Sequence, residues 1–401
     1  MQLRDFGKKS TGRLVPISVD ERGKMVRHVA FVPHPLPNDF AITSDTWNAM
    51  FSASTQLARL NAIAEERLPN PNLLVRPAIR LEAVSTSAIE GTVTTVSEIM
   101  RSDTAELQTH SASVFEVLNF VRATEYAVRR REAFPLSLRF ACELHQILME
   151  DTPGADWQTG KVRRTQVYIG SKRGLGIRDA TFVPTPPGDM LRDGLSQWEK
   201  WIHADSDIHP LVKIAAAHYQ FEALHPFTDG NGRIGRLLAV LHILDSGLLS
   251  DPLINLSSYF EKRSDEYRRR LYEVSTKAAW DEWISFFCSA VAEQALHTEV
   301  RIRALTVWRD AMLERLHKKR VKGVALAVTR DLIAQPTVTV KTISLRHKVS
   351  LQAANQAVTR LAEIGILKEV TGKHHGRIFE APDVFGILAH ETAGKPGGVN
   401  R

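Results

Sequence analysis

The sequence has little that would place it outside ordinary globular proteins. Its two cysteines, Cys142 and Cys288, each lie in an apolar helical pattern, which predicts small buried side chains rather than a disulfide or a metal pair. No run reaches about eighteen uninterrupted apolar residues, so neither a membrane span nor a membrane partner is expected. The N-terminal residues lack the apolar segment of a secretory signal, which makes a cytoplasmic location the default expectation.

Negative charge is scarce in the last quarter of the chain. Residues 301–401 hold 18 Lys or Arg and 8 Asp or Glu, a balance of +10, whereas the whole chain carries +7. Residues 1–300 therefore carry −3. This asymmetry predicts a separate C-terminal module with an anionic partner. The 401 residues, of which 43% are hydrophobic and 24% charged, suffice for two or three domains.

The densest group of chemistry-bearing side chains lies in residues 221–236. His225 can carry a proton near neutral pH, and Asp229 offers a hard oxygen ligand that suits Mg²⁺. A Gly-Asn-Gly run at 230–232 follows, whose backbone can aim several N–H groups at one anion. On its own this run would predict a tight loop or a fragment of a calcium-binding loop.

A buried amphipathic helix is predicted directly after the Gly-Asn-Gly run. Apolar residues recur there at helical spacing: Ile234, Leu237, Leu238, Leu241 and Leu244. The free N–H groups and the dipole at the start of this helix favour a phosphate. Arg233 and Arg236 lie in its first turns, where cations are disfavoured unless an anion is present. Together these features predict phosphoryl or nucleotidyl transfer.

Residues 225–236 read His-Pro-Phe-Thr-Asp-Gly-Asn-Gly-Arg-Ile-Gly-Arg, and here the chain resembles the Fic proteins. The match to the signature His-Pro-Phe-x-Asp-Gly-Asn-Gly-Arg-x-x-Arg is complete. The resemblance implies an AMP transferase that moves adenylate from ATP to a Ser, Thr or Tyr hydroxyl of a target protein, or of itself. Family branches that phosphorylate carry Lys at the position of Gly232, so adenylate transfer is expected.

The resemblance also implies roles for single residues. His225 resembles the base that deprotonates the target hydroxyl, and Asp229 the ligand of an Mg²⁺ ion that bridges the α- and β-phosphates. Arg233 resembles a residue that contacts the α- and β-phosphates, and Arg236 resembles the residue that contacts the γ-phosphate. The expected catalytic residues are His225, Asn231 and Arg236. The remaining nucleotide-binding positions are Gly230, Asn231, Gly232 and Tyr267.

Adenine recognition departs from the family pattern. Relatives often carry a pair of tyrosines near Tyr267 and an asparagine further along. In this chain Arg268 stands at the second tyrosine position and Ser275 at the asparagine position. An arginine can still stack on a base, so ATP remains the expected donor, with another nucleotide as the alternative.

The segment Thr86-Ser87-Ala88-Ile89-Glu90-Gly91 resembles the inhibitory motif of Fic proteins. Taken alone, Glu90 and Gly91 predict a helix end with a capping glycine. In relatives the Glu of this motif pairs with the second signature arginine, here Arg236. The resemblance therefore implies that Glu90, with Thr86 in the same motif, blocks the γ-phosphate position and keeps the enzyme inhibited.

Two segments before the signature differ in character. Residues 1–40 are rich in Pro, Gly and charges and are predicted to form an irregular arm. Residues 152–188 contain β-prone runs between glycines and predict a hairpin, the only convincing sheet of the first 300 residues. The hairpin resembles the Fic flap, which pairs with the target as an added strand through Thr181, Phe182 and Val183. An ordinary structural hairpin is the alternative.

Residues 323–390 predict three short helices and a two-stranded wing. The first helix is expected at 325–333, the second after 338–343 and the third at 350–361. The two strands of the wing are expected at 368–370 and 377–380. This order resembles a winged helix-turn-helix domain. Its third helix would enter the major groove of DNA, and the wing would contact phosphates. The expected base-reading and phosphate residues are Gln352, Asn355 and Gln356, then Arg360, Lys373 and Arg377. Protein docking or dimerisation is the alternative use of such a module.

The expected fold is mainly α: a Fic-type helical bundle with a β-hairpin flap, followed by a C-terminal winged helix-turn-helix domain. The expected divisions are 1–110 for the arm and inhibitory region, 111–295 for the catalytic core, 296–322 for a helical linker, 323–390 for the winged helix, and 391–401 for a disordered tail. The alternative functions are a DNA-binding regulator that uses the core as a nucleotide sensor, and an enzyme that removes AMP. A homodimer is left open.

Overall fold

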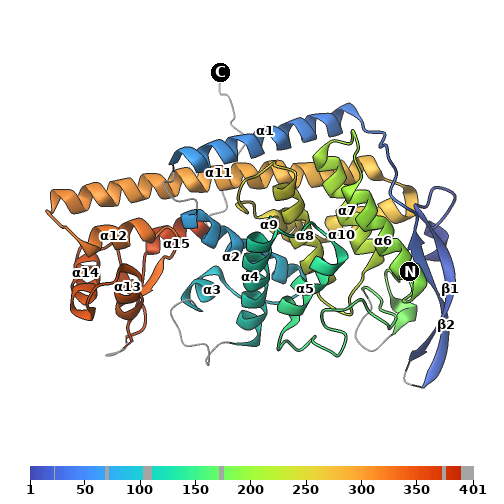
Figure 1. Cartoon of the computed structure of the whole chain (residues 1–401), viewed down its shortest axis with the longest axis horizontal. Coiled ribbons are helices and arrows are strands. Elements are labelled where there is room, and N and C mark those ends of the chain that lie inside the picture. The colour runs from blue at the N-terminus through green and yellow to red at the C-terminus, as the bar shows by residue number, and fades with distance from the viewer. Residues whose placement is uncertain (22, 68–71, 103–110, 171–175, 373–375, 390–401) are drawn as a thin grey trace.

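Figure 1 shows the computed structural model of the chain, which describes all residues except 22, 68–71, 103–110, 171–175, 373–375 and 390–401. The predicted tail at 391–401 and Lys373 of the predicted wing lie outside the described residues. The described part is mainly helical, as expected. None of its helices combines the length and apolar character needed to cross a membrane.

Two long helices, α1 (Ser44–Arg67) and α11 (Trp280–Lys318), lie side by side along the upper edge of Figure 1. They begin at the same end, where the Thr43 amide donates to Asp281 Oδ1 at 2.7 Å. The remaining helices are α2 (Asn72–Ile89), α3 (Val96–Ser102), α4 (Ala112–Arg130), α5 (Leu138–Met149), α6 (Asp189–His203), α7 (Pro210–Leu224), α8 (Asn231–Asp245), α9 (Leu256–Lys262), α10 (Ser264–Lys277), α12 (Val324–Asp331), α13 (Val340–His347), α14 (Leu351–Glu363) and α15 (Pro382–Ala389), with 3-10 turns η1 (Leu3–Asp5) and η3 (Ile177–Asp179).

The central helices are α7 and α8, which pack against each other below α11. In α8 every residue except Gly232, His242 and Asp245 is fully buried, because the apolar stripe predicted from the sequence is flanked by small residues. Burial on all sides is typical of a helix in the middle of a domain. Two arginines of α8 are therefore buried with it, and each requires polar partners inside the protein.

The expectation of an irregular arm at residues 1–40 is wrong. Strands β1 (Gly12–Glu21) and β2 (Lys24–Pro33) form a regular antiparallel hairpin, the longest strand pair in the described residues. The hairpin closes with Glu21 opposite Lys24, and Gly23 adopts the left-handed φ of +81° that the turn requires. Pro and charged residues are tolerated because β1 is an edge strand, where a missing N–H costs no ladder bond.

The described C-terminal part lies below the C-terminal half of α11 in Figure 1. It contains α12 to α15 and an antiparallel sheet of order β3 (Thr337–Thr339), β5 (Ile378–Glu380) and β4 (Lys368–Glu369). Helices α12, α13 and α14 and strands β4 and β5 correspond to predicted helices and wing strands, whereas β3 and α15 were not predicted. The predicted boundary between 295 and 296 falls inside α11, which continues without a break. Arg101 of α3 forms an ion pair with Glu380, so this part also contacts the segment that follows α2.

Candidate active site

The signature residues occupy the turn between α7 and α8. The helix α7 ends at Leu224, and His225 then adopts a left-handed φ of +54°. Gly230 has a φ of +72° directly before α8 begins at Asn231. A left-handed backbone conformation is uncommon for residues other than glycine, so the surroundings must hold His225 in place. The start of α8 thereby lies next to the imidazole.

Two side chains hold the turn from within. The Asn231 side chain accepts from the Phe227 amide at 2.8 Å and donates to the Phe227 carbonyl at 2.9 Å. His145 stacks on the Phe227 ring, with 3.9 Å between centroids. Because His145 Nδ1 accepts from the Gly160 amide, its Nε2 carries the proton and donates to the Asp229 carbonyl at 3.0 Å. His145 is thus the packed core residue that its apolar helix predicts, and burial lowers its pKa to about 4.

The His225 ring is oriented for proton transfer. Its Nδ1 lies 3.2 Å from the Glu222 carbonyl, which can only accept, so Nδ1 carries the hydrogen and Nε2 has a free lone pair. Burial, reinforced by the nearby Arg163 cation, lowers the pKa of His225 to about 4. The ring is therefore neutral at neutral pH and can accept a proton.

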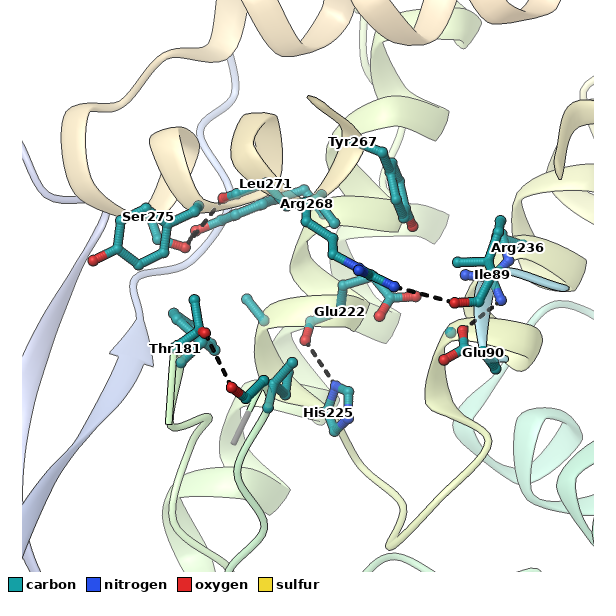
Figure 2. A pocket seen from close by; sticks show the side chains of 17 residues that line it. Ile89, Glu90, Thr181, Glu222, His225, Arg236, Tyr267, Arg268, Leu271 and Ser275 are labelled. Atoms are coloured by element: carbon teal, nitrogen blue, oxygen red, sulfur yellow. Dashed lines mark hydrogen bonds and ion pairs between the residues drawn. The ribbon is translucent and has the colours of Figure 1, made fainter. Parts of the chain in front are cut away.

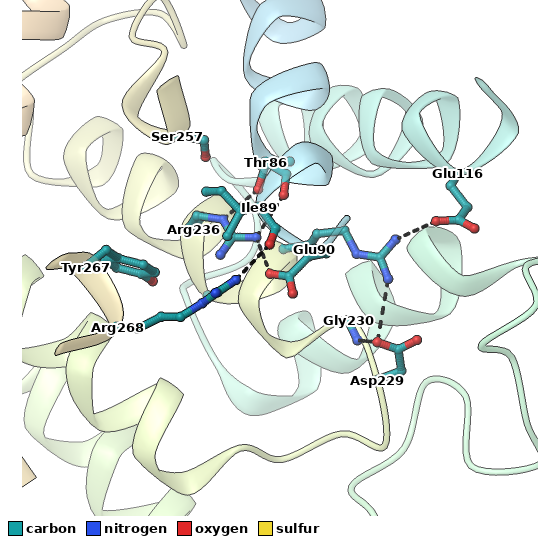
Figure 3. Close-up of polar contacts among 12 residues, drawn as sticks. Thr86, Ile89, Glu90, Glu116, Asp229, Gly230, Arg236, Ser257, Tyr267 and Arg268 are labelled. Atoms are coloured by element: carbon teal, nitrogen blue, oxygen red, sulfur yellow. Dashed lines mark hydrogen bonds and ion pairs between the residues drawn. The ribbon is translucent and has the colours of Figure 1, made fainter. Parts of the chain in front are cut away.

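Arg236 is bound by the end of α2. Its Nε donates to Thr86 Oγ1 at 2.7 Å and its Nη2 to the Thr86 carbonyl at 3.0 Å. The same Nη2 donates to Glu90 Oε1 at 2.6 Å (Figure 3). Burial would raise the pKa of Glu90, but attraction to Arg236 outweighs it and lowers that pKa. A side chain at Gly232 would collide with the Glu90 carboxylate, so glycine at that position makes the contact possible.

Arg233, one turn earlier, has weaker partners. Its Nη1 lies 3.5 Å from Glu116 of α4, and its Nη2 lies 3.7 Å from Asp229 Oδ1. Neither its Nε nor its Nη1 makes a hydrogen bond with a described residue, although the side chain is 5% exposed. A buried cation with unused donors is a favourable binding partner for an anion.

A cavity of about 600 Å³ brings most of these residues together. It opens between the end of α2, residues 169–170 and 181–182, α7, α8 and α10 (Figure 2). The predicted site residues that line it are Glu90, Thr181, Phe182, His225, Gly232, Arg236 and Tyr267. The predicted residues that do not line it are Thr86, Val183, Asp229, Gly230, Asn231 and Arg233.

The residues at the predicted base-binding positions, Tyr267, Arg268 and Ser275, line the cavity and contact other side chains and backbone groups. Tyr267 stacks on Phe260 with 4.5 Å between centroids, and its hydroxyl lies 2.7 Å from His218 Nε2. Arg268 donates to the carbonyl of Ile89, the last residue of α2, at 3.1 Å. Ser275 lies 3.0 Å from the Tyr219 hydroxyl. Arg268 thus touches the same helix end as Arg236.

A model of the Fic/DOC family matches residues 135–243, and a model of the Fic/DOC family N-terminal region matches residues 47–129. The chain contains a Fic domain. The resemblance first seen in twelve signature residues thus extends through most of α1 to α8.

Curated relatives cover a short part of this Fic protein. It is 33% identical over 114 residues to "Protein adenylyltransferase Fic" of Culex quinquefasciatus, which is 28% of this chain and 20% of that one. It is 32% identical over 119 residues to "Protein adenylyltransferase fic-1" of Caenorhabditis elegans, 29% of this chain and 21% of that one. The chain therefore matches about a fifth of the length of these relatives.

A solved structure supports the fold over a longer span. The crystal structure of a Fic family protein from Desulfovibrio desulfuricans G20 aligns with a TM-score of 0.54 at 19% sequence identity. The alignment covers 86% of this chain and 98% of that one. At this identity the likeness concerns the fold alone.

The expected flap of the Fic domain is smaller than predicted. The segments around Ile169 and Phe182 form a single antiparallel bridge, with amide-to-carbonyl distances of 2.8 Å and 3.2 Å. The Phe31 amide of β2 donates to the Val183 carbonyl at 2.8 Å, so the N-terminal hairpin supports this segment. The prediction that this is the only sheet of the first 300 residues is wrong, because β1 and β2 were overlooked.

Sequence reasoning missed two acids near Arg236: Glu82, which is buried, and Glu222, which is partly buried. Glu222 lines the cavity, and its Oε1 makes no hydrogen bond with a described residue. Glu82 accepts from the Ser257 amide at 3.0 Å and from the Ser257 hydroxyl. Burial raises the pKa of each to about 7. Glu222 lies in the Phe-Glu-Ala-Leu stretch directly before His225, which was the available signal.

Proposed function

We propose that this Fic protein is a protein adenylyltransferase that moves AMP from ATP to a Ser, Thr or Tyr hydroxyl of a target protein, or of itself. The observation that carries the proposal is the shared cavity of the His225 imidazole, the N-terminal turn of α8 and the Arg236 guanidinium. A helix N-terminus with a buried arginine suits a polyphosphate, and a neutral imidazole suits removal of a hydroxyl proton.

In the proposed reaction the hydroxyl oxygen of the target attacks the α-phosphorus of ATP. A new oxygen–phosphorus bond forms while the bond from the α-phosphorus to the bridging oxygen breaks, and pyrophosphate leaves with that oxygen. The hydroxyl proton passes to Nε2 of His225, the ring nitrogen left free by the Nδ1 contact with Glu222. Arg233 and Arg236 would hold the phosphate tail, because a guanidinium can bind two oxygens at once.

Asp229 is the residue that would hold Mg²⁺. No group of three or more His, Cys, Asp or Glu suited to a metal occurs in the described residues. A single carboxylate nevertheless fits Mg²⁺, which is commonly held by one or two carboxylates together with substrate phosphates and water. The Asp229 side chain is 55% exposed, and both of its described contacts use Oδ1. Bound there, Mg²⁺ would neutralise phosphate charge.

We also propose that Glu90 inhibits the enzyme by occupying Arg236. Arg236 forms a 2.6 Å ion pair with Glu90 and donates two hydrogen bonds to Thr86. These contacts use the guanidinium group that the γ-phosphate would otherwise contact. Glu90 lies just beyond the last residue of α2, and its side chain is 38% exposed, so it can leave without unfolding that helix. Release of Glu90 would then free Arg236 for ATP.

The decisive experiment compares two labels in the Glu90→Gly variant. ATP labelled at the α-phosphate should transfer its label to protein in the presence of Mg²⁺, whereas ATP labelled at the γ-phosphate should not. Transfer of the γ-label would indicate phosphorylation, and transfer of neither label would refute the proposed activity. Incubation of AMP-labelled protein with wild type tests the alternative of AMP removal.

The C-terminal part supports a second proposal, a winged helix-turn-helix domain that binds DNA. The residues of α14 that face solvent include Gln352, Asn355, Gln356 and Arg360, and Arg377 donates to Asn355 at 3.4 Å. These side chains can read bases or bind phosphates. Affinity for duplex DNA should fall steeply as salt concentration rises. A flat response, or no binding, would leave protein docking as the use of this domain.

A further inference from the structure

Arg163 is a buried arginine that the proposed reaction does not use directly. It lies in the segment between α5 and the flap and is 1% exposed, whereas the next residue, Arg164, is exposed. The sequence patterns assigned it no role. Its burial requires an explanation because a cation inside a protein is costly unless its donors are satisfied.

The Arg163 guanidinium donates to four backbone carbonyls. Nε donates to His225 at 2.7 Å, and Nη2 donates to Leu224 at 3.3 Å. Nη1 donates to Thr165 at 3.0 Å, and Nη2 also donates to Thr185. Two of these carbonyls belong to the end of α7 and the catalytic turn, and the other two flank the flap segment. One side chain therefore joins the two parts of the site.

The backbone of Arg163 adds a fifth contact. Its amide donates to the Pro226 carbonyl at 2.9 Å, so side chain and main chain together bind three consecutive carbonyls, at 224, 225 and 226. The middle residue is His225, whose left-handed conformation must be maintained by its surroundings. The His225 amide donates to the Phe221 carbonyl, so the backbone N–H and C=O of His225 are both held.

No acid balances this cation. Among the residues that the structure describes, no carboxylate forms an ion pair with Arg163, and burial lowers its pKa to about 10, so it stays charged at neutral pH. An arginine that served stability alone would be replaceable by an apolar side chain, since buried charges are often neutral or costly for stability. A fork-shaped donor for four carbonyls is instead suited to fixing geometry.

We propose that Arg163 is a positioning residue for the proposed adenylyl transfer, which holds the His225 backbone and couples the catalytic turn to the flap. The inference rests on the proposed function and concerns the same site. Arg163 does not line the cavity, so it would act through the carbonyls that it binds. A misplacement of the base by about 1 Å can cost about 100-fold in rate.

The test uses the full chain carrying Glu90→Gly, with Arg163→Met, Arg163→Lys and the exposed control Arg164→Met. We expect Arg163→Met to lower kcat of AMP transfer about 100-fold, while the dissociation constant for ATP changes less than about threefold. Arg163→Lys keeps the charge but loses the fork, and should recover part of kcat. Arg164→Met should stay within about twofold of its parent.

Rates are divided by the number of ATP-binding molecules, so that loss of folded protein does not count as loss of activity. A folded Arg163→Met protein with kcat within about threefold of its parent overturns the proposal. If that variant does not fold, Arg163→Lys decides: unchanged kcat with intact ATP binding overturns the proposal as well. A purely structural role predicts a lower melting temperature without a change in kcat per folded molecule.

A second readout separates this proposal from the proposed activity. Arg163 and Glu90 act on His225 through their charges, and the titratable Glu222 side chain lines the same cavity. NMR titration of the His225 ring between pH 4 and 8 should show its pKa rising in Arg163→Met, because a cation is removed. If no variant transfers AMP, the proposed function fails, and this titration still tests positioning. A His225 signal unchanged in shift and titration would then overturn the role of Arg163.

Discussion

Arg233 and Arg236 lie one turn apart on the same helix and are both buried, yet they differ in what binds them. Arg236 donates to Thr86 and Glu90 through three hydrogen bonds of 2.6 to 3.0 Å. Arg233 has acids only at 3.5 and 3.7 Å, and two of its nitrogens form no hydrogen bond with a described residue. The chain itself binds Arg236 through Nε and Nη2, whereas Arg233 keeps two nitrogens that make no hydrogen bond with a described residue.

The difference indicates where a ligand has to compete. An anion beside Arg233 gains hydrogen bonds that the protein does not itself make, so little is lost on binding. An anion at Arg236 must first displace Glu90, which leaves that acid to find water instead. If the proposed reaction is right, we expect its regulation to act at Arg236, and we expect Arg233 to be the arginine that binds phosphate without first losing a partner.

Removal of the base should have the largest effect, without disturbing either arginine. His225→Ala, made in the Glu90→Gly variant, should lower the rate of AMP transfer about 1000-fold, because general bases contribute roughly 100- to 10000-fold. Affinity for ATP, measured by calorimetry, should stay within about threefold. Full activity in this variant would show that His225 is not the base.

Release of Arg236 should have the next largest effect. Glu90→Gly should raise the rate of AMP transfer tenfold or more, which corresponds to about 1.4 kcal/mol of barrier. The matched control is Glu116→Gln, which removes the negative charge 3.5 Å from Arg233. This variant should keep the rate of AMP transfer within about twofold of the wild type. Equal rates for wild type and Glu90→Gly would remove the proposed inhibitory role and with it the contrast between the two arginines.

The two arginines should also differ in how they affect nucleotide affinity. Arg233→Lys should weaken ATP binding about fivefold in both wild type and Glu90→Gly, equivalent to about 1 kcal/mol for lost hydrogen bonds. Arg236→Lys should weaken it only in Glu90→Gly, since Glu90 occupies Arg236 in the wild type. Weaker binding by Arg236→Lys in both backgrounds would mean that ATP displaces Glu90 unaided.

The smallest effect concerns pH and the acids near Arg236. Glu82 and Glu222 have folded-state pKa values raised to about 7, so their contribution to stability is complete below their unfolded pKa and is lost as pH rises through 7. The melting temperature should therefore fall by about 2 °C or more between pH 6 and 8. Glu222→Gln should reduce that fall, and an identical fall in both proteins would exclude Glu222 as its source.

Local sequence patterns predicted the central parts of the site well. The apolar stripe from Ile234 to Leu244 marked α8, and Glu90 with Gly91 marked the end of α2. Both patterns depend on neighbouring residues, which is what propensity and periodicity report. The N-terminal hairpin was missed because charge and Pro content outweighed the β-branched residues on either side of Gly23.

The order of residues by itself determined a turn between two helices that suits a phosphate, and an earlier helix end at which Glu90 is followed by the capping glycine Gly91. Only the tertiary structure decided that Glu90 reaches Arg236, that Arg233 keeps unused donors, and that Arg163 binds the carbonyls around His225. These contacts join residues that are far apart in the chain. No local pattern encodes them, because they depend on how separately formed helices pack.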